Sequence, residues 1–212
     1  MSKTERLKPR VLFNCTTNVK GGGVQNAANF IYHALQDERF EWIFATSHQV
    51  AEVLDSWSIH RDNLIVLDSP ARNVKSRRAL RELEAESSVD LVYTMAGPAY
   101  VHFKSIHVLG ISNPYVTHAQ WEAFVLNRSS REIVLAILGA LYRGLTARFE
   151  AQYWIFQTET SRTGFCRRFK VNREVTSVVP NAVGKAFISD NSTDFELSRG
   201  TSGLGVERIF CP

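Results

Sequence analysis

The chain has 212 residues, a formal net charge of +4 and a sequence pI near 9.1, and its hydrophobic fraction of 44% is that of a soluble globular protein with a full core. Residues 1–10 are polar and basic, unlike a secretory signal, and no apolar stretch reaches the length of a membrane span. We therefore expect a cytoplasmic protein.

Composition also argues against a metal site or a disulfide-bonded fold. Cys15, Cys166 and Cys211 lie far apart, without metal-site or redox-motif spacing, so free thiols are expected. The six histidines form no metal-binding pattern, and no metal ion or cofactor is expected. The mild positive charge suits an anionic small molecule, a lipid headgroup or nucleic acid. Of these three classes of partner, we do not expect nucleic acid.

Short apolar runs predict strands, and apolar residues at helical spacing predict helices between them. The predicted strands are residues 11–15, 42–45, 64–67, 91–95, 106–111, 154–157 and 175–179. The predicted helices are residues 24–35, 48–57, 73–87, about 119–153 and 158–169, two of them with Ser47 and Thr158 as N-caps. This alternation indicates a Rossmann-like, doubly wound α/β fold with a mostly parallel sheet.

Ligands bind such folds at the carboxyl ends of the strands. The segments that follow predicted strands are residues 16–23, 96–104, 112–120, 158–161 and 180–184. The last part of the chain differs in composition: residues 189–205 resemble a linker, and residues 206–212 resemble the first strand of another unit. We therefore predict a domain over residues 1–188, a linker, and the start of a truncated second domain.

Three glycines, Gly21, Gly22 and Gly23, stand between the first predicted strand and helix. Bare amides at a helix start can hold a phosphate. The dinucleotide pattern fails, because Asn26 replaces the third glycine and no acid ends the second strand; the P-loop pattern fails at Val24-Gln25. The alternative interpretation is a flexible turn.

Other candidates follow later strands. Gly97, Tyr100 and His102 could line a pocket or only form a turn, and His118 lies at the expected ligand edge. The long predicted helix alternates apolar residues with arginines. Such a helix either covers the sheet or lies on an anionic membrane surface, so peripheral membrane contact is one hypothesis.

The ordered motifs resemble a known family. The strings are "KGGGVQNAANFI", "DLVYTMAGPAYVHFK", "HVLGISNPY", "YWIFQTETSRTGFCRRF" and "VTSVVPNAVGKAF". Together, over about residues 10–188, they resemble the N-terminal, acceptor-side domain of GT-B retaining glycosyltransferases of the glycosyltransferase-4-like group. The resemblance implies a nucleotide-sugar donor held mainly by a second domain or a partner chain, and a glycan or lipid-linked acceptor held here.

The same resemblance assigns roles to residues. The glycine loop would face the donor phosphates, and the acceptor side would include Gly97, Tyr100, His102, Asn113, His118 and Glu159. Many relatives carry a histidine or aspartate where this chain has Asn113, which cannot act as an acid or base. Asn113 and His118 are the catalytic candidates, and neither is assigned. The isolated chain is expected to be weakly active or inactive.

Two other functions stay open. One is a non-catalytic α/β binding module or subunit that needs a partner chain. The other is half of a nucleotide-sugar epimerase, since some epimerases share the GT-B plan. A nucleotide-dependent reductase is disfavoured by the failed dinucleotide pattern.

Overall fold

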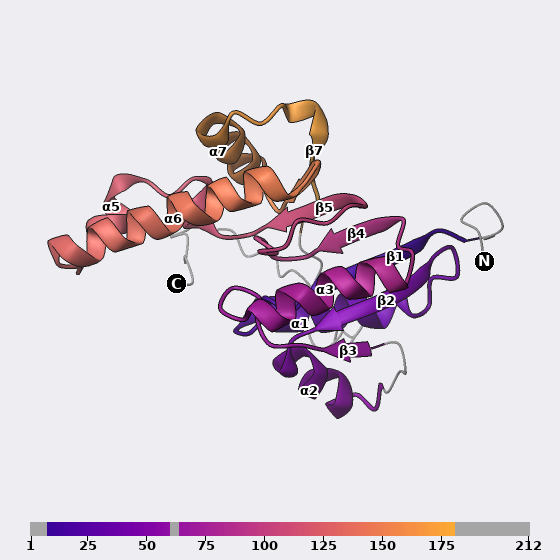
Figure 1. Ribbon diagram of the computed structural model, residues 1–212. Helices are drawn as coiled ribbons and strands as arrows, with labels where there is room; N and C mark the ends of the chain where they lie inside the picture. Colours follow the sequence, from indigo (N-terminus) through magenta and orange to yellow (C-terminus); the bar gives the residue numbers. More distant parts are fainter. Residues whose placement is uncertain (1–7, 60–63, 181–212) are drawn as a thin grey trace, which may run out of the picture.

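The computed structural model describes residues 8–59 and 64–180, which form a seven-stranded sheet flanked by helices (Figure 1). The strands are β1 (Arg10–Cys15), β2 (Glu41–Thr46), β3 (Leu64–Val66), β4 (Leu91–Thr94), β5 (Ile106–Ile111), β6 (Tyr153–Phe156) and β7 (Thr176–Val178). The helices are α1 (Gly22–Ala34), α2 (His48–Ser56), α3 (Val74–Glu86), α4 (Pro114–Thr117), α5 (Trp121–Val125), α6 (Ser130–Glu150) and α7 (Glu159–Phe169). Every predicted strand is confirmed to within one residue at each end.

The boundary at residue 188, the expected linker at 189–205 and the expected strand at 206–212 lie outside the described residues. So do residues 181–184 of the predicted ligand edge.

The sheet has the order β3-β2-β1-β4-β5-β6-β7, and each neighbouring pair is parallel. The expectation of a mostly parallel, Rossmann-like sheet is confirmed. The chain moves in one direction from β1 to β3 and in the other from β4 to β7. The loops that leave β1 and β4 therefore diverge at neighbouring strand ends, which is where doubly wound folds bind their ligands.

The two faces of the sheet carry different helices. Phe13 points to the face where α1 and α2 pack, and Leu12 points to the face of α3. Leu109 and Trp154 share the direction of Leu12 through the strand register, and they pack with α6 and α7. Helices α3, α6 and α7 thus cover one face, and α1 and α2 the other.

The predicted long helix over residues 119–153 is wrong as a single element. The chain forms α4, α5 and α6 there, and Tyr153 already belongs to β6. Asn127 has a positive φ of 56°, which turns the chain after α5. Ser129 then starts α6 with a capping box shared with Glu132. The break lies in the polar run over residues 127–132, whose Ser129 and Glu132 have capping-box spacing, and the sequence prediction passed over this signal.

Helix α6 extends beyond the sheet together with α5 (Figure 1). Its inner part packs closely on α7, because a Cβ at Gly144 would lie 1.9 Å from Cζ of Phe169. Within residues 8–59 and 64–180, no helix combines the length and hydropathy needed to cross a bilayer.

Candidate functional site

A cleft of about 550 Å³, here called the switch-point cleft, opens at the carboxyl ends of β1, β4 and β5. Its walls come from the loops after these strands, the segment before α3 and the middle of α6. The lining includes Thr17, Lys20, Arg72, Gly97, Tyr100, Asn113 and Arg143. Three residues that the sequence singled out separately, Gly97, Tyr100 and Asn113, therefore lie in one cleft.

The switch-point cleft is cationic. Lys20, Arg72 and Arg143 line it, and no aspartate, glutamate or histidine is among the lining residues within 8–59 and 64–180. Nε of Arg143 is buried and has no hydrogen-bond partner in the described part of the chain. A guanidinium that keeps free donors beside a hollow is suited to a phosphate or carboxylate ligand.

Tyr100 forms one wall, and its backbone is held in place from three sides. Its φ is 58°, a left-handed conformation that non-glycine residues adopt only when neighbours enforce it. The Thr17 hydroxyl donates to the Ala96 carbonyl at 2.5 Å, which ties the β4 loop to the β1 loop. The Tyr100 ring stacks on Tyr142 of α6 with centroids 6.3 Å apart, and partial burial raises its pKa.

Beneath this loop lies a buried polar network. Glu150, at the end of α6, accepts a hydrogen bond from the Ala99 amide at 2.8 Å, and desolvation raises the pKa of its carboxyl to about 8. Its backbone carbonyl accepts from Nδ1 of His107 at 2.9 Å, which leaves Nε2 to accept from the Thr94 hydroxyl at 2.9 Å. Asn14 donates to the same hydroxyl at 3.2 Å.

His107 is fully buried, and desolvation lowers its pKa to about 4, so the ring is neutral. The network connects the end of α6 with β5, β4 and β1, and it positions the loop that forms the cleft wall.

The glycine loop lies beside this cleft. Gly21 has a φ of 58° and is the N-cap of α1, and no side chain caps this helix. A Cβ at Gly21 or Gly22 would meet no described atom within 4 Å. The space beside these two glycines is therefore open to the described part of the chain, which leaves room for an anion near the start of α1.

Asn18 holds the glycine loop in shape. Its side chain donates to the Gly23 carbonyl at 2.8 Å, and its own carbonyl accepts from the Ser47 hydroxyl at 2.6 Å. Asn18 and Gly23 also line a second cleft of about 400 Å³ between α1 and the open sheet face over β4–β6. The far wall of that cleft includes Met95 and Ile155, so it is largely apolar.

His118 and Glu159 lie elsewhere. They line a third groove, of about 380 Å³, with Thr160, Arg167 and Arg168. Nδ1 of His118 contacts the Thr117 hydroxyl at 2.8 Å and the Ser161 hydroxyl at 3.3 Å. His118, at the end of α4, and Glu159, in the first turn of α7, thus line a different groove from Asn113, which caps the start of α4.

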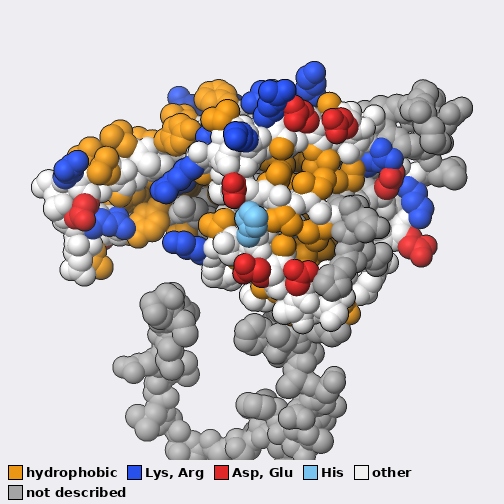
Figure 2. Space-filling model, turned by 60° about the horizontal axis from the view of Figure 1, so that its bottom comes forward, with side chains coloured by type: hydrophobic (Ala, Val, Ile, Leu, Met, Phe, Trp, Pro, Cys, Tyr) orange, Lys and Arg blue, Asp and Glu red, His pale blue; other side chains and the backbone are white. Residues whose placement is uncertain are grey.

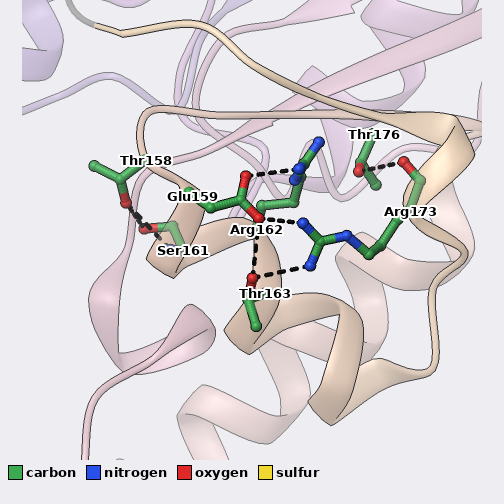
Figure 3. Close-up of polar contacts among 7 residues, drawn as sticks. All are labelled: Thr158, Glu159, Ser161, Arg162, Thr163, Arg173 and Thr176. Carbon is green, nitrogen blue, oxygen red and sulfur yellow. Dashed lines mark hydrogen bonds and ion pairs between the residues drawn. The ribbon is translucent and has the colours of Figure 1, made fainter.

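Glu159 is engaged by neighbouring cations (Figure 3). Its carboxylate pairs with Arg162 at 2.6 Å and with Arg173, and it accepts from the Thr163 hydroxyl at 3.2 Å. The hydrogen bond from Arg162 is the main reason that the pKa of Glu159 is lowered. This cluster ties α7 to the segment before β7, and Thr158 caps α7 as predicted.

His102 is exposed and lines none of the three clefts described above. The following residues carry the chain to the start of β5, where the amides of Lys104 and Ser105 donate to Glu84 of α3 at 2.7 Å each. His102 therefore belongs to the segment that leads the chain back to the start of β5.

Sequence reasoning did not select Lys20, Arg72, Arg143 or Asn18 as site residues. Lys20 adjoins the glycines and Arg72 precedes a predicted helix. Both lie between a predicted strand and the next helix, and that position could have marked them as candidate site residues. Arg143 lies in the middle of a helix, and only the packing of α6 beside the β4 loop directs it into the cleft.

Solved structures resemble this chain, whereas no family model matches it and no curated protein matches it significantly. A putative UDP-N-acetylglucosamine 2-epimerase from Listeria monocytogenes superposes with a TM-score of 0.54 at 14% identity, over 81% of this chain and 44% of that one. UDP-GlcNAc 2-epimerase from Neisseria meningitidis, bound to UDP-GlcNAc, gives 0.53 at 10% identity, over 81% and 46%. A glycosyltransferase from Rickettsia africae gives 0.52 at 14% identity, over 84% and 44%.

The described residues have the Rossmann-like α/β fold of one part of these structures. At these identities the likeness establishes the fold alone. This chain spans less than half the length of each of the three structures.

Proposed function

We propose that the chain is the acceptor-side half of an enzyme that transfers a sugar from a nucleotide-sugar to an anionic glycan or lipid-linked acceptor. The observation that carries this proposal is the switch-point cleft, whose described lining has three cations and no carboxylate. Lys20, Arg72 and Arg143 have no ion-pair partner among the described residues, so their charge is available to a ligand. A phosphate on the acceptor supplies the matching charge.

The glycine loop would contact the nucleotide-sugar donor. The N-terminus of α1 offers uncapped amides and the positive end of a helix dipole. Facing the diphosphate of a nucleotide-sugar, these groups would stabilise the negative charge that develops on the leaving group. The donor would be held mainly by a second domain or by a partner chain, as the resemblance implies.

This half contributes binding and positioning instead of proton transfer. The side chain of Asn113 accepts from the Tyr115 amide at 3.0 Å and caps α4, so its role in the chain is partly structural. His118 lines another groove. Among the described residues, no histidine or carboxylate lines the switch-point cleft, so this part of the chain offers no such group there for general acid–base catalysis.

Half of a nucleotide-sugar epimerase is the second candidate, favoured by the epimerases among the similar solved structures. Epimerisation at a sugar carbon that carries a hydroxyl or amide group, by proton removal, needs a base that takes the proton from that carbon. The lining of the switch-point cleft offers Lys20 and Tyr100 in place of a carboxylate or imidazole. We therefore rank transfer above epimerisation.

Anion binding tests the cleft. Calorimetric titration with inorganic pyrophosphate is expected to give a dissociation constant about tenfold weaker for Lys20→Met and for Arg143→Met, because a hydrogen bond to a charged group is lost. Lys104→Met is the control, since that exposed lysine lies at the opposite end of β5. Equal affinities for all three variants and the wild type would refute a specific anion site.

One assay distinguishes sugar transfer from epimerisation. The protein isolated from its own cells, with any chain that completes the cleft, is incubated in D2O with radiolabelled UDP-GlcNAc and a lipid extract. Transfer predicts label in the lipid or glycan fraction without deuterium in the recovered sugar nucleotide. Deuterium at C2 without transfer would instead establish epimerisation.

A further inference from the structure

Helix α6 exposes an apolar surface, here called the α6 apolar face. Val134, Leu138, Leu141, Leu145 and Phe149 recur every three or four residues, and their exposed fractions are between 49% and 71%. This spacing places them on one side of the helix over about 22 Å. Leu135 and Tyr142, both 58% exposed, widen the same side. Figure 2 shows hydrophobic side chains gathered on this part of the molecule, with arginines or lysines beside them.

The orientation of α6 is the reverse of an ordinary surface helix. Its buried side carries the small residues Ala140, Gly144 and Ala147, which allow close packing on the domain. Its large apolar residues face outward. A surface helix usually directs such side chains to the core, and a contiguous exposed patch of this kind marks a contact surface.

Two arginines border the α6 apolar face, and the exposed Glu122 lies on the neighbouring α5. Arg131 lies 18 residues, or about five turns, before Phe149, so both point in the same direction. Arg148 lies over the Phe149 ring, 5.7 Å from its centroid. Glu132 is engaged in the capping box and Glu150 is buried, so neither carboxylate projects from the apolar side.

We propose that the α6 apolar face docks on the surface of a bilayer that contains anionic lipids. Apolar side chains would enter the boundary between headgroups and acyl chains, and Arg131 and Arg148 would meet lipid phosphates. Exposed Trp121 of α5 and Tyr142 add the aromatic rings that favour this boundary. A second copy fits less well, because two-fold antiparallel pairing would bring Arg131 of one chain near Arg148 of the other.

The docking surface adjoins the switch-point cleft. Tyr142 on the face stacks on Tyr100 of the cleft wall, and the next residue, Arg143, lines the cleft. A bilayer in contact with α6 would therefore bring headgroup phosphates close to the cleft. Only this last step rests on the proposed function; docking itself does not.

Vesicle co-sedimentation tests the docking. The wild type is expected to bind vesicles of 70% phosphatidylcholine and 30% phosphatidylglycerol about tenfold more tightly than pure phosphatidylcholine vesicles. The double variant Leu138→Gln/Leu145→Gln is expected to bind the anionic vesicles at least about tenfold more weakly. Arg131→Gln is expected to reduce the preference for anionic lipid.

Matched controls distinguish vesicle binding through the α6 apolar face from non-specific vesicle binding. Val74→Gln removes an apolar residue of α3 that is 71% exposed, and Arg81→Gln removes an exposed arginine of the same helix; both should bind vesicles as the wild type does. Equal binding by the wild type and the leucine variant, or no binding by the wild type, would overturn the proposal. So would a dimer in light scattering that the leucine variant abolishes, since a second copy would then cover the face. Pyrophosphate titration of the same variants should be unchanged, which distinguishes failure of docking from failure of the cleft.

Discussion

Replacing the buried Glu150 by glutamine is expected to change how stability depends on pH. The folded carboxyl has a pKa of about 8, because desolvation disfavours its charged form, against 4.5 for an ordinary glutamate. The folded state therefore binds one more proton than the unfolded state between these values. Its stabilising contribution is complete below about pH 4.5 and is lost as pH rises towards 8.

The magnitude follows from the two pKa values. Each pH unit within this window changes the free energy of unfolding by about 1.4 kcal/mol. From pH 6.5 to 8 the wild type should lose about 1.5 kcal/mol, slightly less than the full slope because the folded carboxyl is half-ionised at pH 8. His107, whose pKa is lowered from 6.5 to about 4, has a half-protonated unfolded state at pH 6.5 and adds about 0.4 kcal/mol of stability up to pH 8, a change that both proteins share.

Urea unfolding of wild type and Glu150→Gln at pH 6.5, 7, 7.5 and 8 measures this effect. The difference in the free energy of unfolding between the two proteins should shift by about 1.5 kcal/mol in favour of the variant at pH 8. Glutamine keeps an acceptor for the Ala99 amide, so the fold should persist. Parallel pH profiles for the two proteins would refute the assignment of a neutral, buried carboxyl.

The remaining predictions compare two glycines. Gly110→Ala is expected to lower the free energy of unfolding by about 1–3 kcal/mol, because the new Cβ would lie 2.2 Å from the main-chain carbonyl of Met95; thermal unfolding measures this, and an unchanged Tm would contradict the packing. Gly22→Leu is expected to leave Tm within a few degrees of the wild type, since no described atom lies within 4 Å of that Cβ. In the assembled enzyme it should nevertheless reduce turnover sharply, and a retained rate would mean that the glycines only form a turn.

Local signals in the sequence were sufficient for the strands. Apolar runs placed all seven to within one residue, because buried parallel strands are continuous apolar segments between turn residues. The caps Ser47 and Thr158 were also predictable, since a side-chain oxygen needs only the amides of the following turn. The break between α5 and α6 was missed although it has a local signal, the polar run over residues 127–132 with a capping box at Ser129 and Glu132.

The candidate site also has features that the sequence predicted and features that only the structure showed. Alternation of strands and helices predicted the edge of the sheet where Gly97, Tyr100 and Asn113 lie, since parallel strands end at a common edge. The strand order determined which loops meet there, and it placed His118 and Glu159 in a different groove.

The sequence by itself therefore determined the strands, the fold class and the sheet edge where the candidate cleft opens, because hydrophobic period and turn chemistry act over a few residues. Only the tertiary structure decided that Lys20, Arg72 and Arg143 share one cleft and that α6 presents its large apolar residues outward. Both depend on contacts between residues far apart in the chain, such as Gly144 against Phe169 and Tyr142 on Tyr100. Helical periodicity gives the side of a helix on which residues gather, whereas packing decides whether that side faces the core or the solvent.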